Sequence, residues 1–250
     1  MSGVVLQILY AFKRDMLFIG TTIMVALCAG FAYFLGSNAV VEASEAKIVY
    51  MAGFSRIAVI LGFIIFVSFY IKRMIENNEI EVILSHAISR GKMLLSMFIG
   101  FALVLCCLTI PVALILILLK TSLLNLAIWL MSVACEGFVM LAFTLCCSLI
   151  VKSFVLSLSS CFLMYFVGRS IGSFVAYLTL TIKPDIFSIF GSILKIVSFL
   201  VPRFDICGKS GWLIYGDFAM QDIVLFLSQT AIFCMGFLCI ACIDLYKKDI

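Results

Sequence analysis

Long apolar stretches separated by short polar breaks run along most of the chain. Each stretch is about 20 residues or longer, which is the length that a helix needs to cross a bilayer core roughly 30 Å thick. We therefore predict an all-α membrane protein, a six-helix transmembrane bundle that forms one domain over residues 1–250. The six spans are expected at residues 16–35, 49–71, 93–119, 126–151, 154–180 and 223–242.

The segment before the first span has a helical pattern of its own. One side of a helix over residues 1–14 would carry Val4, Val5, Ile8, Leu9 and Phe12, and the other side Gln7, Lys13 and Arg14. An apolar face opposite a basic face is typical of a helix that lies in the membrane interface. The pattern predicts an N-terminal amphipathic interfacial helix.

Composition excludes a water-soluble protein. Apolar residues make up 65% of the chain and charged residues 12%, against roughly 45–50% and 25% in soluble domains. The net charge of +4 is small and spread over the breaks, so it suits membrane topology and not nucleic acid. Ten of the eleven cysteines lie in apolar runs, which favours packing over disulfide formation. We expect membrane lipids as partners and no nucleic acid.

Basic residues in the breaks predict the orientation, because inner loops of membrane proteins are enriched in lysine and arginine. An inner N-terminus places nine of them inside, namely Lys13, Arg14, Lys72, Arg73, Arg90, Lys92, Lys152, Lys247 and Lys248. The short outer breaks carry Lys47 and Lys120, with Arg56 near the outer end of the second span. Four more in residues 181–222 weaken the bias without reversing it. Both termini are predicted to be cytoplasmic, in a bacterial inner (plasma) membrane.

The outer segment 181–222 mixes apolar pieces with prolines and charges. Its apolar pieces are too short and too interrupted for an ordinary crossing. We expect a re-entrant or extracytoplasmic helical hairpin, with a seventh and eighth crossing as the alternative.

The inner break 72–92 has an acidic first half, an apolar ridge at Ile80, Ile83 and Leu84, and a basic end. This pattern predicts a short amphipathic helix, and the alternative is a solvated loop. The break resembles the cytoplasmic segment between the second and third spans of ABC type-2 exporter permeases. The resemblance is carried by Glu76, Asn77, Ile80, Glu81, Ile83, Leu84, Ser85, Ile88, Ser89 and Arg90. Residues 199–205 likewise resemble the stretch before the last span in copper-enzyme-maturation permeases of that family.

The resemblance implies a function. In the family, the segment is a coupling helix that docks on a separate ATPase subunit, so residues 72–92 would be the ATPase-coupling segment. The residues expected to couple are Glu76, Asn77, Glu79, Ile80, Glu81, Leu84, Ser85, His86 and Arg90. The chain would be the permease subunit of an ATP-binding cassette exporter for a lipid, amphipathic or other substrate. Two copies of a cytoplasmic ATPase would bind ATP and Mg, and a second permease subunit would complete a homodimer.

Two other functions stay open beside this one, an ion-coupled secondary transporter and a non-transporting membrane assembly factor. An enzyme is not expected. Gly208-Lys209-Ser210 lacks the earlier glycine of a phosphate loop, and Gly168 to Gly172 match G-x-S-x-G only inside a predicted span. His86 is the only histidine, and Cys239 and Cys242 form a lone C-x-x-C. We therefore expect no catalytic residue, no metal and no cofactor in this chain.

Glu136 and Arg169 are the clear charges inside predicted spans. Each lies about ten residues from the outer end of its span, roughly 15–17 Å deep at about 1.5 Å per residue. A charge at that depth is costly and usually faces the bundle interior. The two could line a substrate route; the alternatives are a buried ion pair between them, or a broken fifth helix that exposes Arg169 to water. Gly168 and Gly172 form a G-x-x-x-G step that permits close helix approach.

Overall fold

The computed structural model describes residues 2–38, 42–79, 89–151, 153–181 and 201–247, and these contain helices and no strand. The helices are α1 Ser2–Arg14, α2 Leu17–Ser37, α3 Ala43–Glu76, α5 Arg90–Leu118, α6 Leu123–Ile150, α7 Phe154–Thr181, α9 Gly211–Tyr215 and α10 Met220–Lys247. Six of them, α2, α3, α5, α6, α7 and α10, are long and apolar enough to cross a membrane. The predicted all-α class and the six spans are confirmed at this level.

Helix α6 lies at the centre of the bundle and contacts α3, α5, α7, α9 and α10. Aromatic rings connect the surrounding helices, since Phe101 of α5 lies edge-on to Tyr70 of α3 at 5.4 Å, and Phe143 of α6 lies edge-on to Phe237 of α10 at 5.1 Å. Helices in lipid are held together by such packing because the surrounding tails are as apolar as the side chains. α5 continues as a helix through Pro111.

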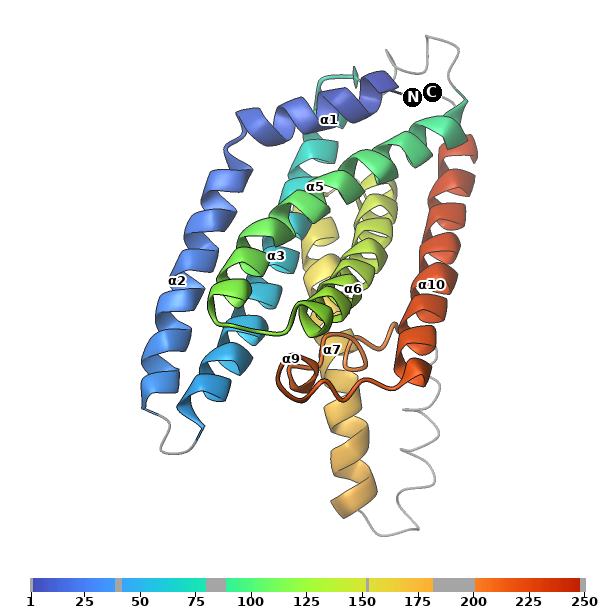
Figure 1. Cartoon of the computed structure of the whole chain (residues 1–250). Helices are drawn as coiled ribbons and strands as arrows, with labels where there is room; N and C mark the ends of the chain where they lie inside the picture. Colours follow the sequence, from blue (N-terminus) through green and yellow to red (C-terminus); the bar gives the residue numbers. More distant parts are fainter. Residues whose placement is uncertain (1, 39–41, 80–88, 152, 182–200, 248–250) are drawn as a thin grey trace.

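The bundle has two ends of different character (Figure 1). One end, here called the terminal face, carries α1, the end of α3, the start of α5 and the end of α10. The opposite end, the cap face, carries the end of α2, the start of α3, the turn between α5 and α6, and the segment before α10. Charged residues are common at both ends, whereas the helix interiors between them are mostly apolar.

α1 lies across the bundle at the terminal face and packs on α5 (Figure 1). Val4, Ile8 and Phe12, three residues of the predicted apolar face, are buried. Phe12 also lies edge-on to Phe66 of α3 at 6.3 Å. The apolar face therefore contacts the protein, and Leu6 and Tyr10 are exposed on the outer side of the helix.

This packing predicts that Ile8 contributes to stability and that Leu6 does not. Ile8→Ala leaves a cavity at a fully buried position, so it should lower the free energy of unfolding by about 2–5 kcal/mol. Leu6→Ala, the control on the same helix, removes a side chain that is 64% exposed and should change it by less than about 0.5 kcal/mol. Unfolding in detergent micelles measures both, and a larger effect of Leu6→Ala would show that α1 packs by its other face.

Candidate functional site

Residues 201–219, here called the cap, fold against the bundle as a loop that includes the short helix α9. Cys207 and Trp212 of the cap are buried with Cys135 of α6 and Phe226 of α10. The backbone N–H of Phe204 donates to the carbonyl of Gly168 at 3.0 Å. These contacts make the cap a packed part of the fold. The predicted hairpin concerned residues 181–222, of which residues 182–200 lie outside the described part.

The G-x-x-x-G step of α7 admits the cap. A side chain at Gly168 would meet the carbonyl oxygen of Pro202 and the ring of Phe204, and one at Gly172 would overlap the carboxylate of Asp205. The close approach that the sequence predicts is therefore present, and its partner is the cap: the Pro202 carbonyl and the Phe204 ring at Gly168, and the Asp205 side chain at Gly172. Glycine at both positions lets these groups reach the helix surface.

A buried ion pair joins α3 to α6 beneath the cap. Arg56 and Glu136 are 2% and 1% exposed. Arg56 Nε donates to Glu136 Oε2 at 2.5 Å, and Arg56 Nη2 donates to the same oxygen. Both residues lie about 13 residues into their helices, or roughly 20 Å at about 1.5 Å per residue, so the two charges meet at the same depth.

The rest of the Arg56 guanidinium is used by the cap. Nη1 donates to the carbonyls of Cys207 and Gly208, each at 2.8 Å, and Nη2 to that of Phe204 at 3.5 Å. Gly208 has a left-handed backbone with φ of 56°, and a side chain there would overlap the guanidinium. Only glycine meets both conditions without strain, so Gly208 fixes how closely the cap approaches Arg56.

Arg169 corrects the sequence prediction. Its Nη1 donates to the carbonyls of Phe204 at 2.8 Å and Cys207 at 3.2 Å, and the structure pairs Glu136 with Arg56 instead. These two bonds place Arg169 level with the cap backbone, and α7 projects beyond α9 and the cap (Figure 1). The predicted pair between Glu136 and Arg169 is therefore replaced by a buried pair between Glu136 of α6 and Arg56 of α3.

The polar centre, defined as Arg56, Glu136, Tyr165 and Arg169, holds two guanidinium groups against one carboxylate. Glu136 Oε1 and the Tyr165 hydroxyl are buried and have no hydrogen-bond partner among the described residues. A buried polar atom without a partner is costly, and such atoms often mark a functional site. The centre can bind and orient a polar group, but in the described chain it presents no activated nucleophile.

Ionisable groups in the cap are perturbed by their surroundings. Burial raises the pKa of the Cys207 thiol from 9.0 to about 11, and the nearby Arg56 guanidinium offsets part of this effect. The hydrogen bond from Arg203 to Asp205, at 2.8 Å, raises the pKa of Arg203. The carboxylate of Glu45, which accepts from the Tyr215 hydroxyl at 3.3 Å, raises the pKa of Tyr215.

The predicted coupling residues lie at the terminal face or outside the described part. Glu76 ends α3 and pairs with Lys72 at 3.3 Å. Asn77 donates to Glu79 at 3.2 Å. Arg90 begins α5 and donates to the carbonyl of Leu245 near the end of α10. The remaining predicted residues lie outside the described part of the chain: Ile80, Glu81, Leu84, Ser85 and His86.

Sequence reasoning missed Arg56 as a site residue. The signal was present, because an arginine 13 positions after the start of a long apolar helix is as deep as the acid that it meets. A span start at residue 49 made it look shallow, whereas α3 begins at Ala43.

Metal-binding clusters are absent from the described residues, since no group of three or more His, Cys, Asp or Glu side chains could hold an ion. All eleven cysteines lie within these residues and are free thiols. No protein-family model matches the chain, and no curated protein matches it. The family resemblance therefore rests on the residues quoted above.

The pair between Arg56 and Glu136 should contribute to the free energy of unfolding. Glu136→Leu leaves the Arg56 charge buried without its counter-ion and should cost about 3–5 kcal/mol of unfolding free energy. Arg56→Leu together with Glu136→Leu should cost less than the two single changes added, because no lone charge remains. Unfolding in detergent measures all three, with Asp217→Leu, an exposed acid at the cap face, as the control. Strictly additive costs would contradict a direct pair.

Cys207 offers a test of the closed cap. At pH 8 its raised pKa should slow alkylation by a water-soluble maleimide about 100-fold relative to an ordinary thiol, because only the thiolate reacts. Burial should slow it further. Ala219→Cys supplies an exposed control within the cap, and peptide mass spectrometry measures both rates. Arg56→Leu should accelerate labelling of Cys207 and leave the control unchanged; equal rates at the two cysteines in the otherwise unaltered cap would contradict its closure.

The Cys207 thiol should also make the free energy of unfolding depend on pH. Its pKa is higher in the folded state than the ordinary 9.0, so folding favours the neutral thiol. The stabilising effect is complete below pH 9 and is lost as pH rises towards about 11. Replacement by serine should remove this part of the alkaline destabilisation, which unfolding measured across that range would reveal.

Proposed function

We propose that the chain is the membrane-spanning permease subunit of an ATP-binding cassette exporter, driven by ATP that a separate subunit hydrolyses with Mg. The resemblance of residues 76–90 to a coupling segment and of residues 199–205 to the stretch before the last span supports this. The six spans are consistent with it. The substrate would be a lipid, an amphipathic molecule or another compound that the polar centre can orient.

The observation that carries the proposal is the continuity of α3. This helix of 34 residues runs from the cap face to the terminal face without a break. Glu76, where the proposed coupling segment meets the helix, is about 20 residues from Arg56, or roughly 30 Å along the axis. Force applied at the coupling segment would therefore reach the ion pair and the cap through one rigid element.

The proposed mechanism follows from this connection. ATP binding draws two ATPase subunits together, and each moves the coupling segment that it holds. The resulting tilt of α3 shifts Arg56 relative to the carbonyls of the cap. The cap then leaves the polar centre, and access alternates between the two sides along a route between two permease subunits, most simply a homodimer.

The orientation is part of the proposal. The terminal face carries Lys13, Arg14, Lys72, Arg73, Arg90, Lys92 and Lys247. The positive-inside rule supports a cytoplasmic terminal face with both termini inside, in a bacterial inner membrane. α1 would lie in the cytoplasmic interface, and the cap would lie on the extracytoplasmic side.

One observation favours a second candidate, an ion-coupled secondary transporter. Glu136 Oε1 is buried and free of hydrogen bonds among the described residues, and mid-membrane carboxylates are the usual proton carriers of such proteins. Against it, each of the six spanning helices is continuous where it is described, whereas the binding sites of secondary transporters often use interrupted helices. A transport rate that follows the proton gradient and is lost in Glu136→Gln would favour this candidate.

Isolation of the tagged chain from its own membranes tests the proposal. An ATPase subunit should co-purify with the chain, and the rate of ATP hydrolysis in the preparation should depend on the presence of the chain. Arg90→Glu should reduce both the bound ATPase and the hydrolysis at least about tenfold, because it reverses a charge at the edge of the proposed docking surface. Glu45→Lys, a charge reversal at the cap face, should leave both unchanged. Full transport by an ATPase-free preparation would overturn the proposal.

A further inference from the structure

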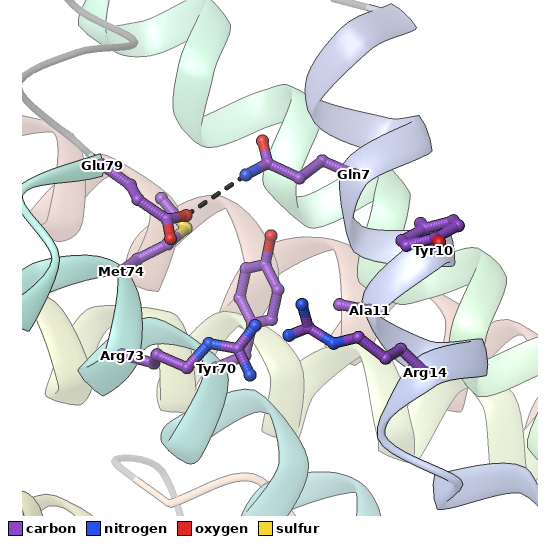
Figure 2. Close-up of a pocket in the computed structure, with 8 residues that line it drawn as sticks. All are labelled: Gln7, Tyr10, Ala11, Arg14, Tyr70, Arg73, Met74 and Glu79. Atoms are coloured by element: carbon purple, nitrogen blue, oxygen red, sulfur yellow. Dashed lines mark hydrogen bonds between the residues drawn. The ribbon is translucent and has the colours of Figure 1, made fainter.

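A polar pocket lies at the terminal face between α1 and the end of α3, far from the polar centre. Its volume is about 120 Å³, several times the space that one water molecule needs. It is lined by Gln7, Tyr10, Ala11, Arg14, Tyr70, Arg73, Met74 and Glu79. Figure 2 shows that two guanidinium groups gather on one side of the pocket, and a carboxylate and an amide on the other, with the Tyr70 ring between them.

The guanidinium side has donors to spare. Arg14 Nε pairs with Asp15 at 3.3 Å, and Arg73 Nη1 pairs with the same carboxylate at 3.5 Å. These two contacts with Asp15 are the ion pairs that Arg14 and Arg73 make within the described residues. Each guanidinium carries five N–H donors in a planar fork, so most of the donors remain available. Two positive charges against one negative charge leave this side with a net positive charge. A phosphate would find several charge-assisted donors here.

The opposite side carries the matching negative charge. Glu79 accepts from the Gln7 amide at 3.2 Å and from Asn77 at 3.2 Å. Both donors are neutral amides, and the described residues supply no cation that pairs with this carboxylate, so it can accept from an ammonium group. The pocket is thus positive at one end and negative at the other, and it is balanced as a whole. A zwitterion suits this arrangement better than a simple anion does.

The surroundings point to a lipid. Arg14 is the last residue of α1, and α2, an apolar helix long enough to span the membrane, begins at Leu17. The pocket therefore lies next to the start of a candidate membrane span. Tyr10, which lines the pocket, is 71% exposed, and an acyl chain can lie on such a side chain. Headgroup chemistry and apolar contacts are available next to each other.

We propose that this pocket binds the headgroup of a phospholipid that carries an ammonium, a phosphoethanolamine lipid, with the phosphate on Arg14 and Arg73 and the ammonium on Glu79. The site is separate from the polar centre. It shares Arg73 and Glu79 with the proposed coupling segment 72–92, but lipid binding there does not require that an ATPase be bound. A bound lipid joins the interfacial helix to α3, and it would do so in a transporter or in an assembly factor alike.

Native mass spectrometry of the delipidated full chain in detergent tests the site. Phosphatidylethanolamine should bind at one tight site per chain, more tightly than phosphatidylglycerol, and diacylglycerol should not occupy it. Free phosphoethanolamine at millimolar concentration should displace phosphatidylethanolamine only weakly. Weak displacement indicates that the ligand is a lipid and not a soluble phosphate ester. Arg73→Gln should weaken phosphatidylethanolamine at least about tenfold, since a hydrogen bond to a charged group is lost.

Three further variants keep the test decisive. Glu79→Gln should weaken phosphatidylethanolamine and strengthen phosphatidylglycerol, which reports on the ammonium position alone. Lys13→Gln, on α1 but outside the pocket, is the matched control and should change neither. Arg73→Lys keeps the charge, so it shows whether a loss in Arg73→Gln reflects misfolding; slow labelling of Cys207 checks the fold in each case.

Other results with the same variants would overturn the proposal. Equal weakening of both lipids in Glu79→Gln would overturn the ammonium assignment and hence the proposed ligand. Binding that is unaffected by Arg73→Gln, or affected as much by Lys13→Gln, would overturn the site itself. Loss of the associated ATPase would affect none of these measurements, so failure of the exporter proposal is distinguishable from failure of this one.

Discussion

The Arg56 guanidinium is the group on which the cap-face half of the molecule depends. It binds the carboxylate of Glu136 on one side and the carbonyls of Cys207 and Gly208 on the other. An arginine buried at this depth is stable only when its donors are used. The cap supplies the acceptors that α6 does not, so the ion pair and the closed cap stabilise each other. α3, α6 and the cap are thereby held at one point.

The spans themselves were predictable from hydrophobic length, because lipid imposes one requirement on every crossing. Backbone groups must be hydrogen-bonded within the segment, and about 20 apolar residues must be available. The face of α1 was predictable for a similar reason, since its apolar side is read from a helical period. What that period does not reveal is the surface on which the face packs, and here the surface is α5 and α3.

The partner of Glu136 was not predictable from the depth of charges in the predicted spans. Depth was counted from apolar boundaries, and α3 continues for six residues beyond the predicted boundary through a segment that contains Glu45 and Lys47. The partners of Arg169 were hidden for another reason. They are backbone carbonyls, and every residue has one, so side-chain identity in the sequence gives no sign of them. Glycines at Gly168 and Gly172 predicted that something approaches α7 closely, but not that it is a loop.

Two carbonyls of the cap accept hydrogen bonds from two different helices. The oxygens of Phe204 and Cys207 each receive a donor from Arg56 of α3 and from Arg169 of α7. A peptide group shared in this way cannot follow one helix without losing its bond to the other. Sliding of α3 against α7 by even one helical turn, about 5.4 Å, would break both sets of bonds together. The loop therefore makes the relative position of the two helices an all-or-none property rather than a gradual one.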